Sequence, residues 1–188
     1  MMRQKRFPVS NLTQVEGDLA PERLLETLKS HRFTEGLPDP ILSKLPALAR
    51  PVAFQQDEVI FRAGERSPYL YLVLSGSVCV EIRTPFYSVC VEAVGPGEAF
   101  GWSSLLDHHD TVFQVRARES SVALCLDAEQ LLATCHENPR FGFELFRRLF
   151  GVVADRVRAT EARLAEFCGY ASPVKLKRVT ACDPREAP

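Results

Sequence analysis

The sequence predicts a mainly β domain with flanking helices, in which an antiparallel double-sheet roll is preceded by short helices and followed by one long helix. Two periodicities indicate this class. Apolar residues alternate in short runs between residues 51 and 127, and they recur at helical spacing on both sides of that segment. No helix within the alternating segment is long enough to connect parallel strands, so we expect the strands to pair antiparallel.

The chain before residue 51 predicts an arm and two short helices. Residues 1–20 mix basic and polar residues without an apolar period, which is typical of a loose arm. Residues 21–30 (PERLLETLKS) place three leucines on one face behind a proline at the first turn, and this pattern predicts a helix. Apolar residues at helical spacing in residues 38–49 predict a second helix.

Six segments of the alternating region predict strands, because they are rich in β-branched and aromatic residues and are separated by turn residues. They are VAF, EVIFR, YLYLVLSGSVCVEIR, YSVCVEAV, TVFQVRA and SSVALCLD. In the third of these, Val78, Val80 and Ile82 are expected to share one face of a strand. Glycines at the ends of the segments predict the corners of the roll.

Helical spacing returns after Asp127, a candidate N-cap for a short helix, and a long helix follows over residues 141–168. At about 1.5 Å per residue this helix is about 40 Å long, which exceeds what a small roll covers. Its apolar residues recur about every 3.5 positions, which is typical of a coiled-coil seam. We therefore expect a homodimer through this dimerisation helix, with packing along its own roll as the alternative. The predicted seam is Phe146, Leu149, Val153, Val157, Thr160, Leu164 and Phe167.

The composition limits the classes of function. The chain has 188 residues and a net charge of −1, which suit one domain and give no reason to expect nucleic acid or a membrane as partner. The N-terminus does not resemble a signal peptide and no run approaches a membrane span, so we expect a cytoplasmic protein. The predicted parts are an arm (1–20), a roll with leading helices (21–140), the long helix (141–168) and a flexible tail (169–188).

Cysteines and histidines form no pattern typical of a metal site. His108 and His109 are neighbours in a polar loop, without a partner at the spacing of a known zinc motif. The cysteines are scattered without a close pair, so we expect small core residues rather than a metal or redox cluster. They are Cys79, Cys90, Cys125, Cys135, Cys168 and Cys182. We expect no metal and no cofactor.

Three motifs, in the same order and spacing, resemble the cyclic nucleotide-binding domain, the sensor module of catabolite-activator and FNR-type regulators. The likeness covers about residues 31–167. It implies the roll predicted above, a dimer formed through the long helix, and a ligand-binding cassette that starts at Gly101. The motifs are Phe61-Arg62-x-Gly64-Glu65, Leu72-Val73-x-x-Gly76-Ser77-Val78 and Gly97-Glu98-x-Phe100-Gly101.

The cassette departs from the pattern that this resemblance implies. In members that bind cyclic AMP or cyclic GMP, helix-start amides and an arginine hold the phosphate, and a glutamate accepts a ribose hydroxyl. Here Trp102 stands at the glutamate position, and the count back from the closing strand places Thr111 at the arginine position, with Val112 beside it. Neither side chain replaces the missing charge. The two losses cost about 3–6 kcal/mol, or about a hundredfold to ten-thousandfold in affinity.

Three alternatives for anion binding stay open. Arg116 or Arg118 could reach in from the closing strand, although strict alternation places Arg116 on the face opposite Thr111. Ser103 and Ser104 could bind an anion through their hydroxyls and amides, or simply cap the short helix. The two loop histidines could supply a cation at low pH.

The sequence therefore predicts a stand-alone, cyclic-nucleotide-binding-like regulatory domain with a small anionic or nucleotide-like ligand and an unknown protein partner. The alternative is a ligand-free dimeric scaffold whose pocket is filled by its own side chains, foremost Trp102 with Phe113. The segment after residue 168 is too short for a helix-turn-helix, so DNA is not expected as a partner. A metal enzyme with a cupin-like jelly roll would need histidines and a glutamate that converge inside the roll, so no enzyme is expected.

Overall fold

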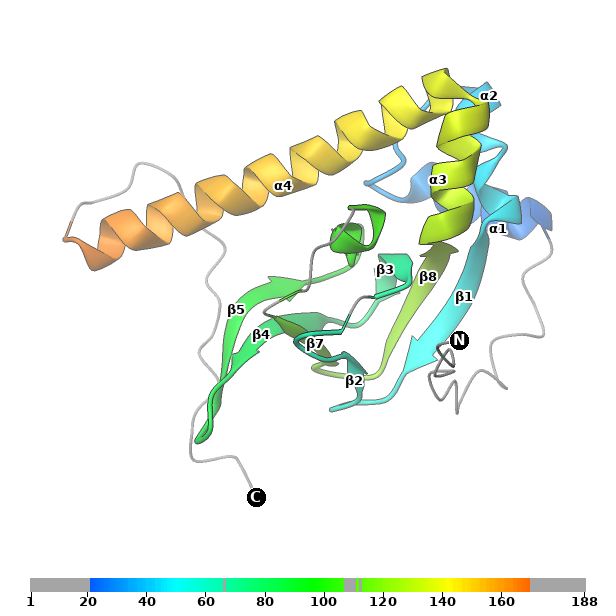
Figure 1. Cartoon of the computed structure of the whole chain (residues 1–188). Coiled ribbons are helices and arrows are strands. Elements are labelled where there is room, and N and C mark those ends of the chain that lie inside the picture. Colours follow the sequence, from blue (N-terminus) through cyan, green and yellow to red (C-terminus); the bar gives the residue numbers. More distant parts are fainter. Residues whose placement is uncertain (1–20, 66, 107–110, 112, 170–188) are drawn as a thin grey trace, which may run out of the picture.

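The strands form a roll of two four-stranded antiparallel sheets, shown in the computed structural model of Figure 1. The structure describes residues 21–65, 67–106, 111 and 113–169. The strand order is β1-β8-β3-β6 in one sheet and β2-β7-β4-β5 in the other. The predicted mainly β class is confirmed. The strands are β1 (Ala49–Phe54), β2 (Val59–Phe61), β3 (Tyr69–Ser75), β4 (Val78–Arg83), β5 (Ser88–Val94), β6 (Ala99–Phe100), β7 (Gln114–Ala117) and β8 (Ser121–Asp127).

In the described chain, helices precede β1 and follow β8 in the sequence. The predicted helix over residues 38–49 is wrong, because the segment forms one α-helical turn and one 3₁₀ turn before β1 starts. Pro46 opposes a continuous helix, since it has no N–H to donate and disfavours the α conformation in the residue before it. The helices are α1 (Pro21–Ser30), α2 (Asp39–Leu42), η2 (Leu45–Ala47), η3 (Trp102–Leu105), α3 (Ala128–Glu137) and α4 (Pro139–Phe167).

Two side-chain caps fix where the C-terminal helices begin. The Asp127 carboxylate accepts a hydrogen bond from the Gln130 N–H at 3.0 Å, which confirms the predicted cap of α3. The Asn138 side chain accepts from the Phe141 N–H at 3.1 Å, and α4 begins at Pro139, earlier than predicted. None of the described helices is both long enough and apolar enough to cross a membrane.

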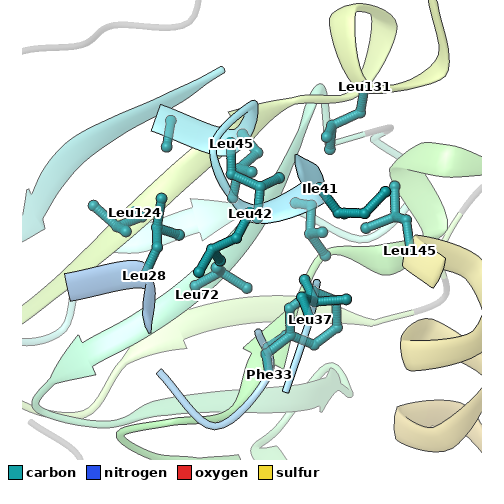
Figure 2. Close-up of a cluster of buried hydrophobic side chains, with 14 of the residues drawn as sticks. Leu28, Phe33, Leu37, Ile41, Leu42, Leu45, Leu72, Leu124, Leu131 and Leu145 are labelled. Atoms are coloured by element: carbon teal, nitrogen blue, oxygen red, sulfur yellow. The ribbon is translucent and has the colours of Figure 1, made fainter. Parts of the chain in front are cut away.

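The roll has two apolar cores, and β3 contributes to both because its two faces are buried. Figure 2 shows Leu72 of β3 and Leu145 of α4 in the core between the helices and the sheet. We call this the helix-side core: Leu24, Leu28, Phe33, Leu37, Ile41, Leu42, Leu45, Ala49, Leu70, Leu72, Ala99, Leu105, Leu124, Leu126, Ala128, Leu131, Phe141, Leu145 and Leu149. The roll interior consists of Phe54, Phe61, Tyr71, Val73, Val78, Val80, Val94, Phe100, Val115, Ala117, Ala123 and Cys125.

The hairpin of β4 and β5 projects from the body of the roll (Figure 1). Val78 and Val80 share a face, as predicted, and this face lies in the roll interior, but Ile82 is 39% exposed. The reason is the length of β7, whose pairing with β4 ends at Glu81. Beyond that residue no strand of the described chain pairs with β4 on this side.

A disulfide links Cys79 of β4 to Cys90 of β5, with their Cα atoms 5.8 Å apart. The prediction that the cysteines form no pair is therefore wrong. The hairpin register explains the proximity, because Cys90 lies opposite Glu81, two residues from Cys79 on the same strand. Among the other cysteines Cys125 is buried, Cys135 is half-buried and Cys168 is exposed, and Cys182 lies outside the described residues.

The first half of α4 shares the helix-side core with the roll through Phe141, Leu145 and Leu149. The roll and the long helix, which were predicted as separate parts, therefore share one apolar core. The predicted arm (1–20) and almost all of the predicted tail lie outside the described residues.

Candidate functional site

The candidate cassette starts at Gly101, directly after β6. This residue has a φ of +79°, in the left-handed region. A Cβ atom at this position would lie 2.6 Å from the Tyr69 carbonyl oxygen and 3.1 Å from the Tyr71 ring. Both the dihedral and the close approach require glycine, so Gly101 fixes the direction in which the chain enters η3.

The turn η3 holds the two predicted serines. Its N-cap is Gly101, and no side chain caps it, so the interpretation of Ser103 and Ser104 as caps is wrong. Ser104 is fully buried and its N–H donates to the Gly101 carbonyl at 3.0 Å, while Ser103 is half-buried. The turn is therefore a buried corner of the roll rather than a solvent-facing helix end.

Trp102 lies against α4. Its ring packs on the helix-side core, and the Arg156 guanidinium lies 5.9 Å from the ring centroid. Arg156 also pairs with the Glu92 carboxylate at 2.9 Å and donates to the Ala99 carbonyl at 3.1 Å. Trp102, which the motif spacing predicts at the position of the usual glutamate, is thus covered by a cation from the chain's own helix.

The Thr111 hydroxyl is engaged with its own backbone. It accepts from the Phe113 N–H at 3.1 Å and lies 3.2 Å from the Phe113 carbonyl oxygen, a short turn that threonine commonly forms. The Thr111 carbonyl accepts from the Gly64 N–H at 2.7 Å. Val112 and the loop histidines, His108 and His109, lie outside the described residues.

Aromatic side chains from the strands fill the roll interior. Tyr71 and Phe100 stack with ring centroids 4.6 Å apart, and Phe61 stacks on Phe100 at 6.4 Å. Trp102 packs on the helix-side core, whereas Phe113 packs on the roll interior, so the expectation that these two fill one pocket together is wrong. The strand residues Phe61, Tyr71 and Phe100 pack in the roll interior instead.

The family model of the cyclic nucleotide-binding domain matches residues 51–138, the segment that forms this roll and cassette. Over these residues the chain is similar to the cyclic nucleotide-binding domain family. The resemblance predicted from the three motifs is confirmed.

Relatives of this cyclic nucleotide-binding domain occur in bacterial regulators and in a kinase subunit. The CRP-like cAMP-activated global transcriptional regulator of Mycobacterium tuberculosis is 26% identical over 143 residues, which are 76% of this chain and 62% of that protein. The chain thus spans less than two thirds of that relative's length. The Thermus thermophilus catabolite activator protein is 26% identical with a TM-score of 0.60, over 73% of this chain and 63% of that one. The regulatory subunit of a cAMP-independent protein kinase A from Trypanosoma brucei is 28% identical with a TM-score of 0.52, over 57% and 39%.

Arg116 does not enter the cassette of this domain. Its guanidinium pairs with Glu81 at 2.9 Å and donates to the Asp57 carbonyl at 2.8 Å. The same carboxylate accepts from the Gln114 side chain. This arginine therefore connects β7 to β4 and to the turn before β2, and it is not available to replace the arginine that the motif count predicts to be absent at Thr111.

Glu92 is the charged group on the cyclic nucleotide-binding domain that faces α4. Burial raises the pKa of its carboxyl, with a smaller push in the same direction from Glu98, whereas Arg156 and Arg163 act to lower it. Sequence reasoning missed Glu92 and Arg156. A helical signal existed for the arginine, because Leu145, Leu149 and Arg156 lie on one face of α4.

The opposite face of α4 is an exposed apolar stripe. Leu149 is 6% exposed and belongs to the helix-side core, so its assignment to the predicted seam is wrong. Phe150, which is 74% exposed, stands in its place. With this exchange the steps alternate regularly between four and three, as in a coiled-coil seam. All members are exposed except Val153, which is half-buried, and all are apolar except Thr160. The stripe is Phe143, Phe146, Phe150, Val153, Val157, Thr160, Leu164 and Phe167.

Within the described part of the chain, no three histidine, cysteine, aspartate or glutamate side chains are grouped so that they could hold a metal ion. A water-sized cavity of about 10 Å³ lies away from the cassette, between the N-terminal helices and α4. It is lined by Phe33, Leu37, Ile41, Leu45, Phe141, Leu145 and Arg148.

Proposed function

We propose that this chain is a non-enzymatic, cytoplasmic regulatory domain that has the form of a cyclic nucleotide cassette but does not hold cyclic AMP or cyclic GMP in the usual way. The observation that carries the proposal is the state of Thr111, whose hydroxyl bonds its own backbone at the position where the phosphate would need an arginine. Trp102 adds to this, because it offers no acceptor for a ribose hydroxyl. Two charged hydrogen bonds are lost, which weakens binding by about a hundredfold to ten-thousandfold.

The Trypanosoma brucei relative supports this proposal. Its regulatory subunit belongs to a cAMP-independent kinase. A variant of that subunit, in which a glutamate is changed to alanine, a threonine to arginine and the valine after it to alanine, was solved with cyclic AMP bound in the A site. The present chain has the same dipeptide, Thr111-Val112, in its cassette. We infer that this dipeptide disfavours cyclic AMP binding in the present chain.

Restoring the missing side chains tests the proposal. Calorimetric titration with cyclic AMP compares the wild type with a Trp102→Glu, Thr111→Arg, Val112→Ala variant. We expect the wild type to bind at about millimolar or weaker, and the variant to gain about a hundredfold or more. The matched control carries Thr111→Lys in place of Thr111→Arg and should gain less, because lysine lacks the planar fork. Equal affinities for all three proteins would contradict the assignment of these positions.

We further propose that two copies of the chain associate through the exposed stripe of α4. Val157 is 50% and Leu164 is 62% exposed, and burying such side chains favours association by about 1.5–3 kcal/mol for each fully covered residue. Light scattering of a Val153→Glu, Val157→Glu variant should give the monomer mass. Arg158→Glu, on the neighbouring polar face, is the control and should keep the wild-type mass. An unchanged mass for the double variant would rule out this seam.

The output partner in this proposal is a protein rather than DNA. The net charge of −1 supports this, because nucleic-acid binding depends mainly on clustered basic residues. A ligand-free scaffold is the second candidate function, and the stacked aromatics of the roll interior favour it. A titration series with cyclic dinucleotides separates the two, since micromolar binding of any of them would exclude the ligand-free scaffold. Micromolar binding of cyclic GMP would instead contradict the regulatory function proposed above.

A further inference from the structure

The face of α4 that lies on the roll changes its chemistry halfway along the helix. In the first half Phe141, Leu145 and Leu149 are buried in the helix-side core, and Val152 packs against its edge. Beyond Val152 no residue of α4 belongs to either core, although Ala162 is buried, and arginine side chains make hydrogen bonds to the roll. An arginine, Arg156, makes the next set of contacts to the roll.

Arg156 joins three parts of the cassette region at once. Its Nε donates to the Glu92 carboxylate on β5 at 3.0 Å, and its Nη2 donates to the Ala99 carbonyl on β6 at 3.1 Å. Its guanidinium carbon lies over the ring of Trp102 at the start of η3. Only 19% of the Arg156 side chain is exposed, so these contacts are partly shielded from water.

Arg163 makes a second attachment one heptad further along α4. The register of β4 and β5 shifts between Val80, which pairs with Glu92, and Glu81, which pairs with Cys90. Val91 is therefore the extra residue of a bulge and has no partner on β4. Its carbonyl accepts a hydrogen bond from Arg163.

We propose that Arg156 is a latch that holds the C-terminal half of α4 over the cassette, with Glu92 as the internal anion that satisfies it. The apolar first half of the helix is the fixed part, and the segment after Val152 is the part that can be released. An anionic ligand or a partner that competes for Arg156 would open the latch and uncover Trp102. This step rests on the regulatory function proposed above, although its test requires no ligand.

Trp102 provides the readout, because it is the only tryptophan of the chain. The test compares acrylamide quenching of its fluorescence in the wild type and in an Arg156→Gln variant. Glu92→Gln removes the same ion pair from the roll side and reports on the latch if the helix variant does not fold. The control is Arg158→Gln, since Arg158 is 70% exposed and its ion pair is with Asp155 of the same helix.

We expect both latch variants to raise the quenching constant at least about twofold and the control to leave it unchanged. Losing the charged contacts should also raise amide hydrogen exchange in residues 157–167 by about tenfold or more, with residues 141–149 unaffected. Quenching and exchange equal to those of the wild type in both latch variants would overturn the proposal. Tight cyclic AMP binding by the wild type would instead overturn the proposed function and leave these two measurements as they are.

Discussion

Replacing Gly101 by alanine should destabilise the domain more than the same change at any glycine with open space around it. The left-handed φ of +79° costs an alanine about 1–2 kcal/mol, partly offset by about 0.4–1 kcal/mol from the less flexible unfolded chain. The new Cβ would also lie 2.6 Å from the Tyr69 carbonyl oxygen, so the backbone must shift. Strain of this kind adds about 1–3 kcal/mol, and we expect a total loss of about 2–4 kcal/mol.

Two other glycines are matched controls for this change. Gly64 has a φ of +77° but no atom within 4 Å of the point that a Cβ would occupy, so Gly64→Ala isolates the cost of the dihedral, about 0.5–1.5 kcal/mol. Gly151 lies in α4 with open space, and Gly151→Ala should stabilise by about 0.5–1 kcal/mol. Urea unfolding of the three variants measures these differences. Equal losses for Gly101→Ala and Gly64→Ala would refute the close approach as the reason for glycine in the cassette.

Three further predictions concern stability. Burial lowers the pKa of His31 below 6.5, so the free energy of unfolding should fall as the pH is lowered below about that value. Urea unfolding over a pH series measures this fall, which should be smaller in a His31→Asn variant. A Cys79→Ser, Cys90→Ser variant should lose about 2–3 kcal/mol by denaturant unfolding, because the disulfide closes a loop of 11 residues, and a loss below about 0.5 kcal/mol would argue against the bond. Asp127→Ala should cost about 1 kcal/mol in the same assay through loss of the α3 cap, and Asp127→Ser should restore most of it.

The fold was predictable because the signals for its elements are local. Strand alternation and turn residues placed the sheets, and Asp127 placed the start of α3. The failure at residues 38–49 was also a matter of local chemistry, since Pro46 was present in the sequence and was outweighed by the apolar spacing.

The seam error at Leu149 has a different cause. α4 has two apolar stripes, one for its own roll and one exposed, and adjacent residues such as Leu149 and Phe150 both fit a spacing near 3.5. Periodicity alone does not say which stripe faces which surface. That assignment depends on how α4 lies across the roll, which is a tertiary property.

The glycine of the cassette was predictable from the sequence, but the contact between α4 and the cassette was not. Gly101 and Trp102 follow from motif spacing, whereas the contact between Arg156 and Glu92 joins residues 64 positions apart. The disulfide was predictable in part. A hairpin centred near residue 85 places Cys79 and Cys90 on neighbouring strands, but their diagonal offset depends on the bulge at Val91.

The central claim is that this cassette does not bind cyclic AMP in the usual way, and calorimetric titration of the wild-type chain tests it most directly. The expected result is no saturable heat below about millimolar cyclic AMP, because we assign Thr111 and Trp102 to the arginine and glutamate positions. A dissociation constant in the micromolar range, abolished by Thr111→Ala, would contradict the account.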